Sequence, residues 1–191
     1  MTLRTLPTTL LAALLLFGLP ASATTMLRLD VPELSQNSDT VVHGTVRRVE
    51  SRWSGDRRRI LTDVEIQVTE SLKGQPGSTV LVIQPGGKMG DIGQMVHGTA
   101  SFVPGEEVVV FLERKGASAF QLSGMSQGKY QVRRAADNTT ALAVPEDTQH
   151  VLLLDPDTRQ ASTTARKTLT LQELKAAIRT ALQQPAKEKR Q

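Results

Sequence analysis

Apolar and polar side chains alternate along most of residues 59–72 of this chain. Ile60 and Val64 fall on one face of an extended backbone, whereas Asp63 and Glu65 fall on the other. Successive side chains of a β-strand point to opposite sides of the sheet, so this spacing of two predicts a long strand with one buried face. One strand cannot bury such a face alone, which indicates a sheet or barrel of several strands.

Further segments with the same character extend this prediction to a mainly β chain. Residues 40–53 are predicted to form another long strand, and Gly44 within it indicates a bend or bulge. Residues 79–84 are a nearly continuous apolar run, typical of a central strand covered on both faces. The remaining candidates are a hairpin of 99–103 with 107–114, a second pair of 119–125 with 129–133, and two weaker strands at 141–144 and 151–154.

Two segments have helical spacing instead. Residues 31–36 fit one or two helical turns. Near the C-terminus, apolar side chains fall on one face of a helix expected over about residues 170–183. Thr170 followed by Glu173 forms a capping box at its start. The apolar face predicts that this helix packs against the sheet, and the polar residues 184–191 are expected to form a disordered tail.

The segment from residue 85 to residue 98 contains five glycines and little periodicity, which predicts a long loop. Gly86–Gly93 resembles a phosphate-binding loop in glycine content, but Met89 stands where Ser or Thr is needed and no helix pattern follows. A single carboxylate, Asp91, makes a poor cation site. Loops of this length in compact domains are often either functional or mobile.

The first 23 residues match a signal peptide of the Sec type. Arg4 precedes the apolar run Leu10–Leu19, and Pro20 leads into the small residues Ala21-Ser22-Ala23. The apolar run is about half as long as a membrane-spanning helix needs to be. We therefore expect cleavage after Ala23, no stable membrane insertion afterwards, and a mature protein in the periplasm or the medium. The chain has no cysteine, which excludes lipid attachment at the cleavage site.

Composition limits the size and chemistry of the mature protein. Cleavage leaves 168 of the 191 residues, which fits one domain of ordinary size, expected over residues 24–183. The absence of cysteine excludes disulfides, thiol catalysis and thiolate metal sites. Removal of Arg4 with the signal peptide lowers the formal net charge from +4 to about +3. This excess is too small to indicate an anionic partner by itself.

One segment matches a catalytic motif without its usual context. Gly124–Gly128 fits G-x-S-x-G, which in α/β-hydrolases places a nucleophilic serine between a strand and a helix. Here Ser126 precedes a strand pattern, so a hairpin turn is the simpler interpretation. His150 and Asp137 are the residues available as partners for a triad. A hydrolase that uses Ser126 is therefore kept as an alternative to a non-catalytic domain.

The histidines and the paired carboxylates do not form metal-binding or catalytic patterns. His43, His97 and His150 lie far apart, and none has a second ligand at i+2 or i+4. They are expected to be ordinary hydrogen-bonded or exposed side chains. Glu106 and Glu107 are adjacent, and neighbours in an extended chain point to opposite faces, so we expect turn and strand-edge charges. No metal or cofactor is predicted.

Six arginines gather near the turn between the first two long strands. They are Arg47, Arg48, Arg52, Arg57, Arg58 and Arg59. Strand alternation would place Arg57 and Arg59 together with Arg58 opposite, which gives a patch of two cations beside Trp53. Such a patch binds polyanions weakly, whereas exposed arginines also solubilise a long hairpin and protect its edges. Trp53, Arg57 and Arg59 are the candidate partner-binding residues.

Three runs of sequence carry a family resemblance: Ser38–Val46, Glu70–Gly74 and Pro104–Leu112. Over about residues 31–132 the chain resembles a group of uncharacterised exported bacterial proteins, and the order of the runs is similar to that of the netrin-like, or tissue-inhibitor-of-metalloproteinase, variety of the OB barrel. Some relatives of that type accompany secreted metalloprotease modules. Those inhibitors bind the protease zinc through an N-terminal cysteine, which this chain lacks, so the resemblance implies the barrel without that mechanism.

These observations predict a mainly β fold, an OB-like antiparallel β-barrel with a C-terminal amphipathic α-helix. The expected function is an exported, non-catalytic binding or accessory domain whose partner is an exported protein or a polyanion. Nucleic acid is disfavoured because single-strand binding needs several stacking aromatic side chains and Trp53 stands alone. The alternatives are an inhibitor of a co-secreted protease and a hydrolase that uses Ser126.

Overall fold

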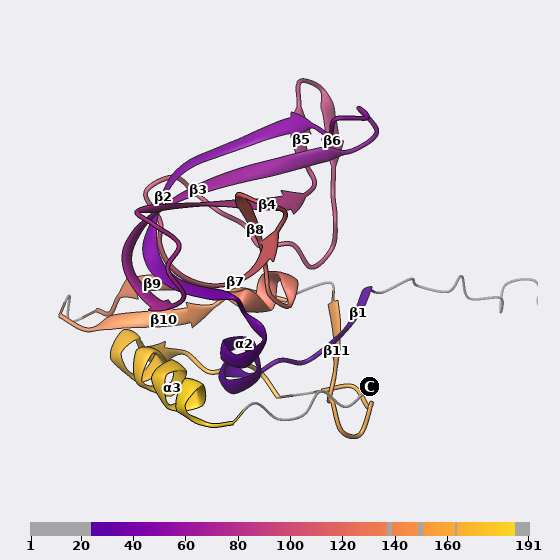
Figure 1. The fold of residues 1–191 in the computed structure, drawn as a ribbon. Helices are drawn as coiled ribbons and strands as arrows, with labels where there is room; N and C mark the ends of the chain where they lie inside the picture. Colours follow the sequence, from indigo (N-terminus) through magenta and orange to yellow (C-terminus); the bar gives the residue numbers. More distant parts are fainter. Residues whose placement is uncertain (1–23, 137–138, 149–150, 163, 186–191) are drawn as a thin grey trace, which may run out of the picture.

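The computed structural model describes residues 24–136, 139–148, 151–162 and 164–185. It is mainly β, with one large sheet and a C-terminal helix, as predicted (Figure 1). In chain order the elements are β1 (Thr24–Leu27), α2 (Val31–Asn37), β2 (Thr40–Trp53), β3 (Ile60–Lys73), β4 (Thr79–Pro85), β5 (Gly87–Met89), β6 (Ile92–Gln94), β7 (Glu107–Lys115), β8 (Ala119–Leu122), the short 3-10 helix η1 (Met125–Gly128), β9 (Lys129–Arg134), β10 (Ala141–Pro145), β11 (Val151–Leu154), β12 (Leu169–Thr170) and α3 (Leu171–Gln183).

Some of the predictions concern residues outside these ranges. They are the signal peptide at 1–23, the triad partners Asp137 and His150, and residues 186–191 of the tail. Thr24, the residue that follows the predicted cleavage site, is the first residue of β1. Cleavage after Ala23 would therefore leave this strand intact.

The large sheet has the strand order β12-β10-β9-β7-β2-β3-β4-β8. An additional pairing joins β7 to β8, so the pairings β7-β2-β3-β4-β8 lead back to β7. All of these pairings are antiparallel except the contact between β4 and β8, which is parallel at Val82 and Phe120. Two small sheets stand apart, a parallel pair of β1 with β11 and an antiparallel pair of β5 with β6.

The two long strands β2 and β3 form a hairpin that extends beyond the rest of the large sheet (Figure 1). Ile60, Val64 and Ile66 of β3 are buried, which confirms the face assigned from the alternation. The register of β2 against β3 shifts at three places, one of them between His43 and Gly44. These irregularities confirm the predicted bend, because each extra residue twists and bends the strand.

Two apolar cores lie on opposite sides of the sheet, and β7 contributes to both. Val108, Val110 and Leu112 of β7 enter the core enclosed by β2, β3, β4 and β8. Val109 and Phe111 point the other way and pack in the core shared with α2 and α3. Alternate side chains of β7 thus pack in two different cores, because both faces of this strand are covered.

Both helices cover the second core (Figure 1). The capping box at the start of α3 is present, with Thr170 and Glu173 bonded reciprocally, and Leu174 and Ile178 are fully buried. At the end of α2, the ammonium group of Lys73 donates to the carbonyl oxygens of Ser35, Gln36 and Ser38. Lys73 thereby satisfies carbonyls that a helix end leaves without partners. Neither described helix is long and apolar enough to cross a membrane.

One predicted strand, one predicted strand pairing and one predicted burial pattern are wrong. Residues 99–103 form no strand; side chains satisfy this backbone instead, because Ser101 N–H donates to Glu146 and Val103 N–H donates to Glu106. β8 and β9 do not form a hairpin with each other, since each pairs with β7. β4 is buried on one face only, through Val80 and Val82, and its other face is half-buried.

The glycine-rich segment is not a featureless loop. It forms the hairpin β5–β6, which lies against the far end of β2 and β3 (Figure 1). The approach is close, because a Cβ atom built at Gly87 would overlap the hydroxyl groups of Ser51 and Thr62. The amide of Ile60 donates to Gln94 Oε1 at 2.7 Å, which fixes β6 to the start of β3.

Candidate functional site

The predicted arginine site lies at the tip of the long β2–β3 hairpin. Ser54 and Asp56 build the turn, because the amide of Arg59 donates to Ser54 Oγ at 3.0 Å and the amide of Arg58 donates to Asp56 Oδ1 at 3.2 Å. The Ser54 hydroxyl and the Arg58 amide lower the pKa of the Asp56 carboxyl below its ordinary value. Trp53, half-buried, is the last residue of β2 and pairs with Ile60.

The predicted arrangement of the arginines at this tip is wrong. β3 begins at Ile60, so Arg57, Arg58 and Arg59 lie in the turn and not on a strand. Arg57 adopts a left-handed backbone with φ of 56°, which breaks the alternation assumed from the sequence. All three side chains are exposed, and none forms an ion pair with another described residue, whereas Arg52 pairs with Asp63 at 2.7 Å.

A first pocket of about 470 Å³ lies where the β5–β6 hairpin meets the ends of β3 and β4. Thr62, Gln84, Gln94 and Met95 are among its lining residues, and Met95 is 83% exposed. The pocket has no charged lining residue, so it offers amide and hydroxyl groups only. The Thr62 hydroxyl is already committed, because it donates to the carbonyl oxygen of Gly86 at 2.7 Å.

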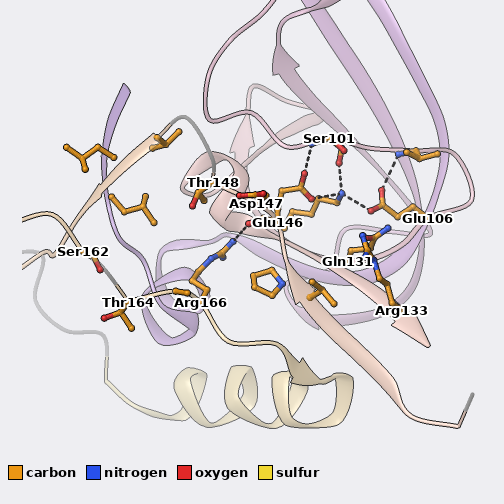
Figure 2. A pocket seen from close by; sticks show the side chains of 18 residues that line it. Ser101, Glu106, Gln131, Arg133, Glu146, Asp147, Thr148, Ser162, Thr164 and Arg166 are labelled. Carbon is orange, nitrogen blue, oxygen red and sulfur yellow. Dashed lines mark hydrogen bonds and ion pairs between the residues drawn. The ribbon is translucent and has the colours of Figure 1, made fainter. Parts of the chain in front are cut away.

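A second and larger pocket, of about 750 Å³, lies between β9–β10 and β11. Figure 2 shows its polar side chains, with Gln131 and Arg133 at the right of the view, Thr148 and Ser162 at the left, and Arg166 between them. Pockets of roughly 300–1,000 Å³ that combine apolar walls with a few fixed polar groups are typical ligand sites. We call this cavity the Arg166 pocket.

A buried lysine forms one wall of the Arg166 pocket. Lys129 is 1% exposed, and its ammonium lies 2.8 Å from Glu106 and 3.0 Å from Glu146. It also donates to the carbonyl oxygen of Ser101 and lies 4.7 Å from the centre of the Phe102 ring. The three N–H groups of this ammonium therefore all have acceptors, which satisfies the requirement for a buried charge.

Arg166 enters the same pocket from the segment before β12. Its guanidinium donates to the carbonyl oxygens of Gln127, at 2.5 Å, and Glu146, at 3.0 Å, and it lies 5.2 Å from the centre of the Tyr130 ring. Burial lowers the pKa of Arg166, although the nearby Tyr130, Asp30 and Glu146 act in the opposite direction. Burial also raises the pKa of Tyr130.

Among the sequence candidates, His43 and the paired glutamates have structural partners. His43 Nε2 lies 2.7 Å from Glu107, and His43 Nδ1 lies 3.1 Å from the ammonium of Lys175 on α3. Glu106, by contrast, faces Lys129, so the two neighbouring glutamates point to opposite sides as predicted. The prediction that both are turn or edge charges is wrong for Glu106, whose side chain is 6% exposed and ion-paired.

Ser126 lies in the helix η1, between β8 and β9, and not at a strand-to-helix elbow. Its side chain is fully buried, and its Oγ has no hydrogen-bond partner among the described residues. A nucleophile needs a base within hydrogen-bond reach and access for its substrate. In this conformation Ser126 has neither within the described chain. His97 is exposed, and the described residues contain no group of three or more His, Asp or Glu that could hold a metal ion.

The sequence pattern did not indicate Lys129, Glu146 or Arg166. A partial signal exists at β9, where Lys129 begins a strand that buries Tyr130 and Val132 on its opposite face. A cation inside a strand with one buried face is usually taken as solvent-exposed. Glu146 and Arg166 lie 17 and 37 residues further along, and only the packing of β10 and the segment before β12 brings them together.

The chain is not assigned to a family by comparison with known proteins. No protein-family model matches it, and no curated protein sequence matches it. The resemblance to netrin-like barrels therefore stays a prediction from three short runs of sequence.

Proposed function

We propose that this protein is an exported, non-catalytic binding domain built on an OB-type barrel, and that it binds a polyanion through the tip of its β2–β3 hairpin. Export is supported by the signal-peptide pattern of residues 1–23. Absence of catalysis is supported by the burial of Ser126.

The pairing order of the strands supports the barrel. OB folds are five-stranded, partly open barrels, and the loop between their first two strands is one of the loops that bind oligonucleotides and oligosaccharides. Here five strands, β7-β2-β3-β4-β8, pair in a ring, and the β2–β3 turn is the connection between the first two of them in sequence. This comparison with OB folds is an analogy of architecture and supports the position of the site alone.

The observation that carries the binding site is the group of three unpaired cations at the hairpin tip. Arg57, Arg58 and Arg59 are exposed and form no ion pair with the described residues. Arg48 and Arg52, further down the same hairpin, are already paired with carboxylates. Guanidinium groups match sulfate, phosphate and carboxylate groups well, and the tip lies at the end of a hairpin that extends beyond the rest of the large sheet (Figure 1).

Trp53 supplies a direct readout of binding, because it is the single tryptophan and it borders the arginine turn. We expect heparin to change its fluorescence saturably, and the affinity to fall about tenfold or more between about 50 and 200 mM NaCl. Arg57→Ala with Arg59→Ala should abolish the change. The matched control is Arg134→Ala with Lys167→Ala, which removes the same charge from exposed positions elsewhere and should leave binding intact.

Four results would contradict this function. Binding that is independent of salt, or that survives the double substitution at the tip, would place the polyanion elsewhere. Inhibition of exported proteases by the purified protein would instead favour the alternative of an inhibitor of a co-secreted protease. Esterase activity that is lost in Ser126→Ala without loss of folding would favour the hydrolase.

A further inference from the structure

The Arg166 pocket lies apart from the hairpin tip and has its own chemistry. Its residues come from the segment 101–106, from β9, β10 and β11, and from residues 162–166. Three sets of groups face the cavity: the ion-paired cluster of Lys129, the cation of Arg166, and a set of apolar side chains. Each set limits the ligand that the pocket can hold.

The two glutamates that line the cavity are committed to other groups. Glu106 accepts from Lys129 with one oxygen and from the amide of Val103 with the other. Glu146 likewise accepts from Lys129 and from the amide of Ser101. Both glutamates are therefore fixed, and their two negative charges exceed the single positive charge of Lys129 by one. Asp147 also lines the pocket, and it is exposed.

Arg166 is left as a partly buried cation without a carboxylate partner. No described carboxylate lies within 4.0 Å of its guanidinium, and its two recorded acceptors are neutral backbone carbonyls, those of Gln127 and Glu146. The Tyr130 hydroxyl is a further neutral partner of this guanidinium, so only part of its five N–H donors remains for a ligand. A desolvated cation is stabilised strongly by a carboxylate that accepts two of these donors side by side.

Part of the rest of the lining is apolar. Val144, Pro145, Val151 and Leu153 line it. Two of the large apolar side chains that the fold leaves exposed, Val103 at 60% and Leu152 at 43%, belong to the same lining. Exposed apolar side chains that gather around a cavity indicate a ligand with an apolar surface.

We propose that the Arg166 pocket binds a small molecule or chain end that carries a carboxylate on an apolar body. The carboxylate accepts hydrogen bonds from the guanidinium of Arg166, and the apolar part lies against Pro145, Val151 and Leu153. The glutamates held by Lys129 keep the pocket wall rigid and repel a second anionic group, which favours a ligand with a single negative charge.

Octanoate tests this proposal in the exported protein labelled with 15N. Titration followed by two-dimensional NMR should shift the amide signals of Leu152, Leu153 and Arg166 saturably. Octanamide, which has the same apolar chain without the charge, should bind about tenfold more weakly, as expected for loss of a charge-assisted hydrogen-bonded pair. The spectrum also reports whether each variant is folded.

Variants separate the role of Arg166 from that of general charge. Arg166→Gln should weaken octanoate binding about tenfold, and Arg166→Lys should weaken it several-fold because the planar pair of donors is lost. Arg133→Gln removes a cation from the same pocket and serves as the matched control, with an expected change of less than about threefold. If Arg166→Gln does not fold, the affinity of Arg166→Lys for octanoate and the comparison of octanoate with octanamide still test the proposal.

Three outcomes would overturn the proposal. They are octanoate shifts that do not saturate or that fall outside the pocket, equal affinity for octanamide and octanoate, and equal loss of affinity in the Arg133 and Arg166 variants. None of these results depends on heparin binding at the hairpin tip, so failure of this site and failure of the proposed function are distinguishable.

Discussion

The ammonium group of Lys175, on α3, donates a hydrogen bond to Nδ1 of His43, on β2, across 3.1 Å. A neutral imidazole accepts at one nitrogen and donates at the other, so this contact assigns the ring proton to Nε2, which donates to Glu107 at 2.7 Å. Lys175 also lies 2.7 Å from Glu70 on β3. The network therefore fastens α3 to three strands of the large sheet, beyond the contacts of its apolar face.

Removal of the lysine should weaken the whole network. We expect Lys175→Met to lower the free energy of unfolding by about 1 to 3 kcal/mol, because His43 and Glu70 lose a shared donor at a buried position. Urea denaturation measures the change. Arg179→Met is the control, since Arg179 also pairs with Glu70 but is 57% exposed, and its loss should change stability by less than about 0.5 kcal/mol. Equal losses of unfolding free energy in the two variants would mean that the burial of Lys175 does not strengthen its contribution to stability.

The same network makes stability depend on pH in the acidic range. The hydrogen bond from Lys175 lowers the pKa of Glu70 below its ordinary value near 4.5, although burial opposes the shift. The unfolded chain then binds the proton more readily than the folded one, so this contribution to stability is complete above about pH 5 and is lost as the pH falls through the lowered pKa. Glu70→Gln should flatten the fall in unfolding free energy between about pH 5 and pH 3. If the unfolding free energy of Glu70→Gln falls with pH as steeply as that of the parent protein, Glu70 does not cause this pH dependence.

Gly44 should tolerate no side chain. A Cβ atom at this position would overlap the carbonyl oxygen of Gln67 and lie 2.9 Å from Cγ2 of Ile66. We expect Gly44→Ala to destabilise the protein by about 1 to 3 kcal/mol, as overpacking does elsewhere. Gly55→Ala is the matched control, because nothing lies within 4 Å of a Cβ atom there. The midpoint of thermal unfolding should be measured for both variants. An unchanged midpoint in Gly44→Ala would mean that β2 and β3 move apart at this position at little cost in free energy.

Export should leave Thr24 as the first residue of the mature protein. The small residues before it fit a signal-peptidase site, and cleavage there keeps all of β1. N-terminal sequencing of protein from the periplasm or medium is the measurement. A mature chain that still begins at Met1 would contradict the predicted localisation, and cleavage beyond Leu27 would remove the strand that pairs with β11.

The local sequence pattern was sufficient to predict those elements whose buried face or cap is formed by neighbouring residues. The strand from Ile60 buries every second side chain, and the helix after Thr170 carries its own cap, so both were correctly predicted. The segment 99–103 has the apolar spacing of a strand, but its backbone is satisfied by the side chains of Glu106 and Glu146. The contact with Glu146 depends on a partner 45 residues along the chain, which a local pattern does not contain.

The two candidate sites also differ in how far the sequence alone could predict them. The arginines near Trp53 are neighbours in sequence and could be recognised there, although the left-handed backbone at Arg57 breaks the strand alternation assumed for them. The Arg166 pocket depends on contacts between segments that the sequence keeps apart, including the parallel pairing of β1 with β11. Such pairings join residues about 125 positions apart, and their register is set by packing and not by a turn.

The position of β7 between the two cores determines how the molecule unfolds. Because Val109 and Val110 belong to different cores and are joined by one peptide bond, neither core can lose its packing while β7 stays in place for the other. The molecule should therefore melt in a single cooperative transition, with the same midpoint by circular dichroism and by tryptophan fluorescence. The amide hydrogens of β7 should exchange with solvent only through global opening of the chain, more slowly than those at the hairpin tip.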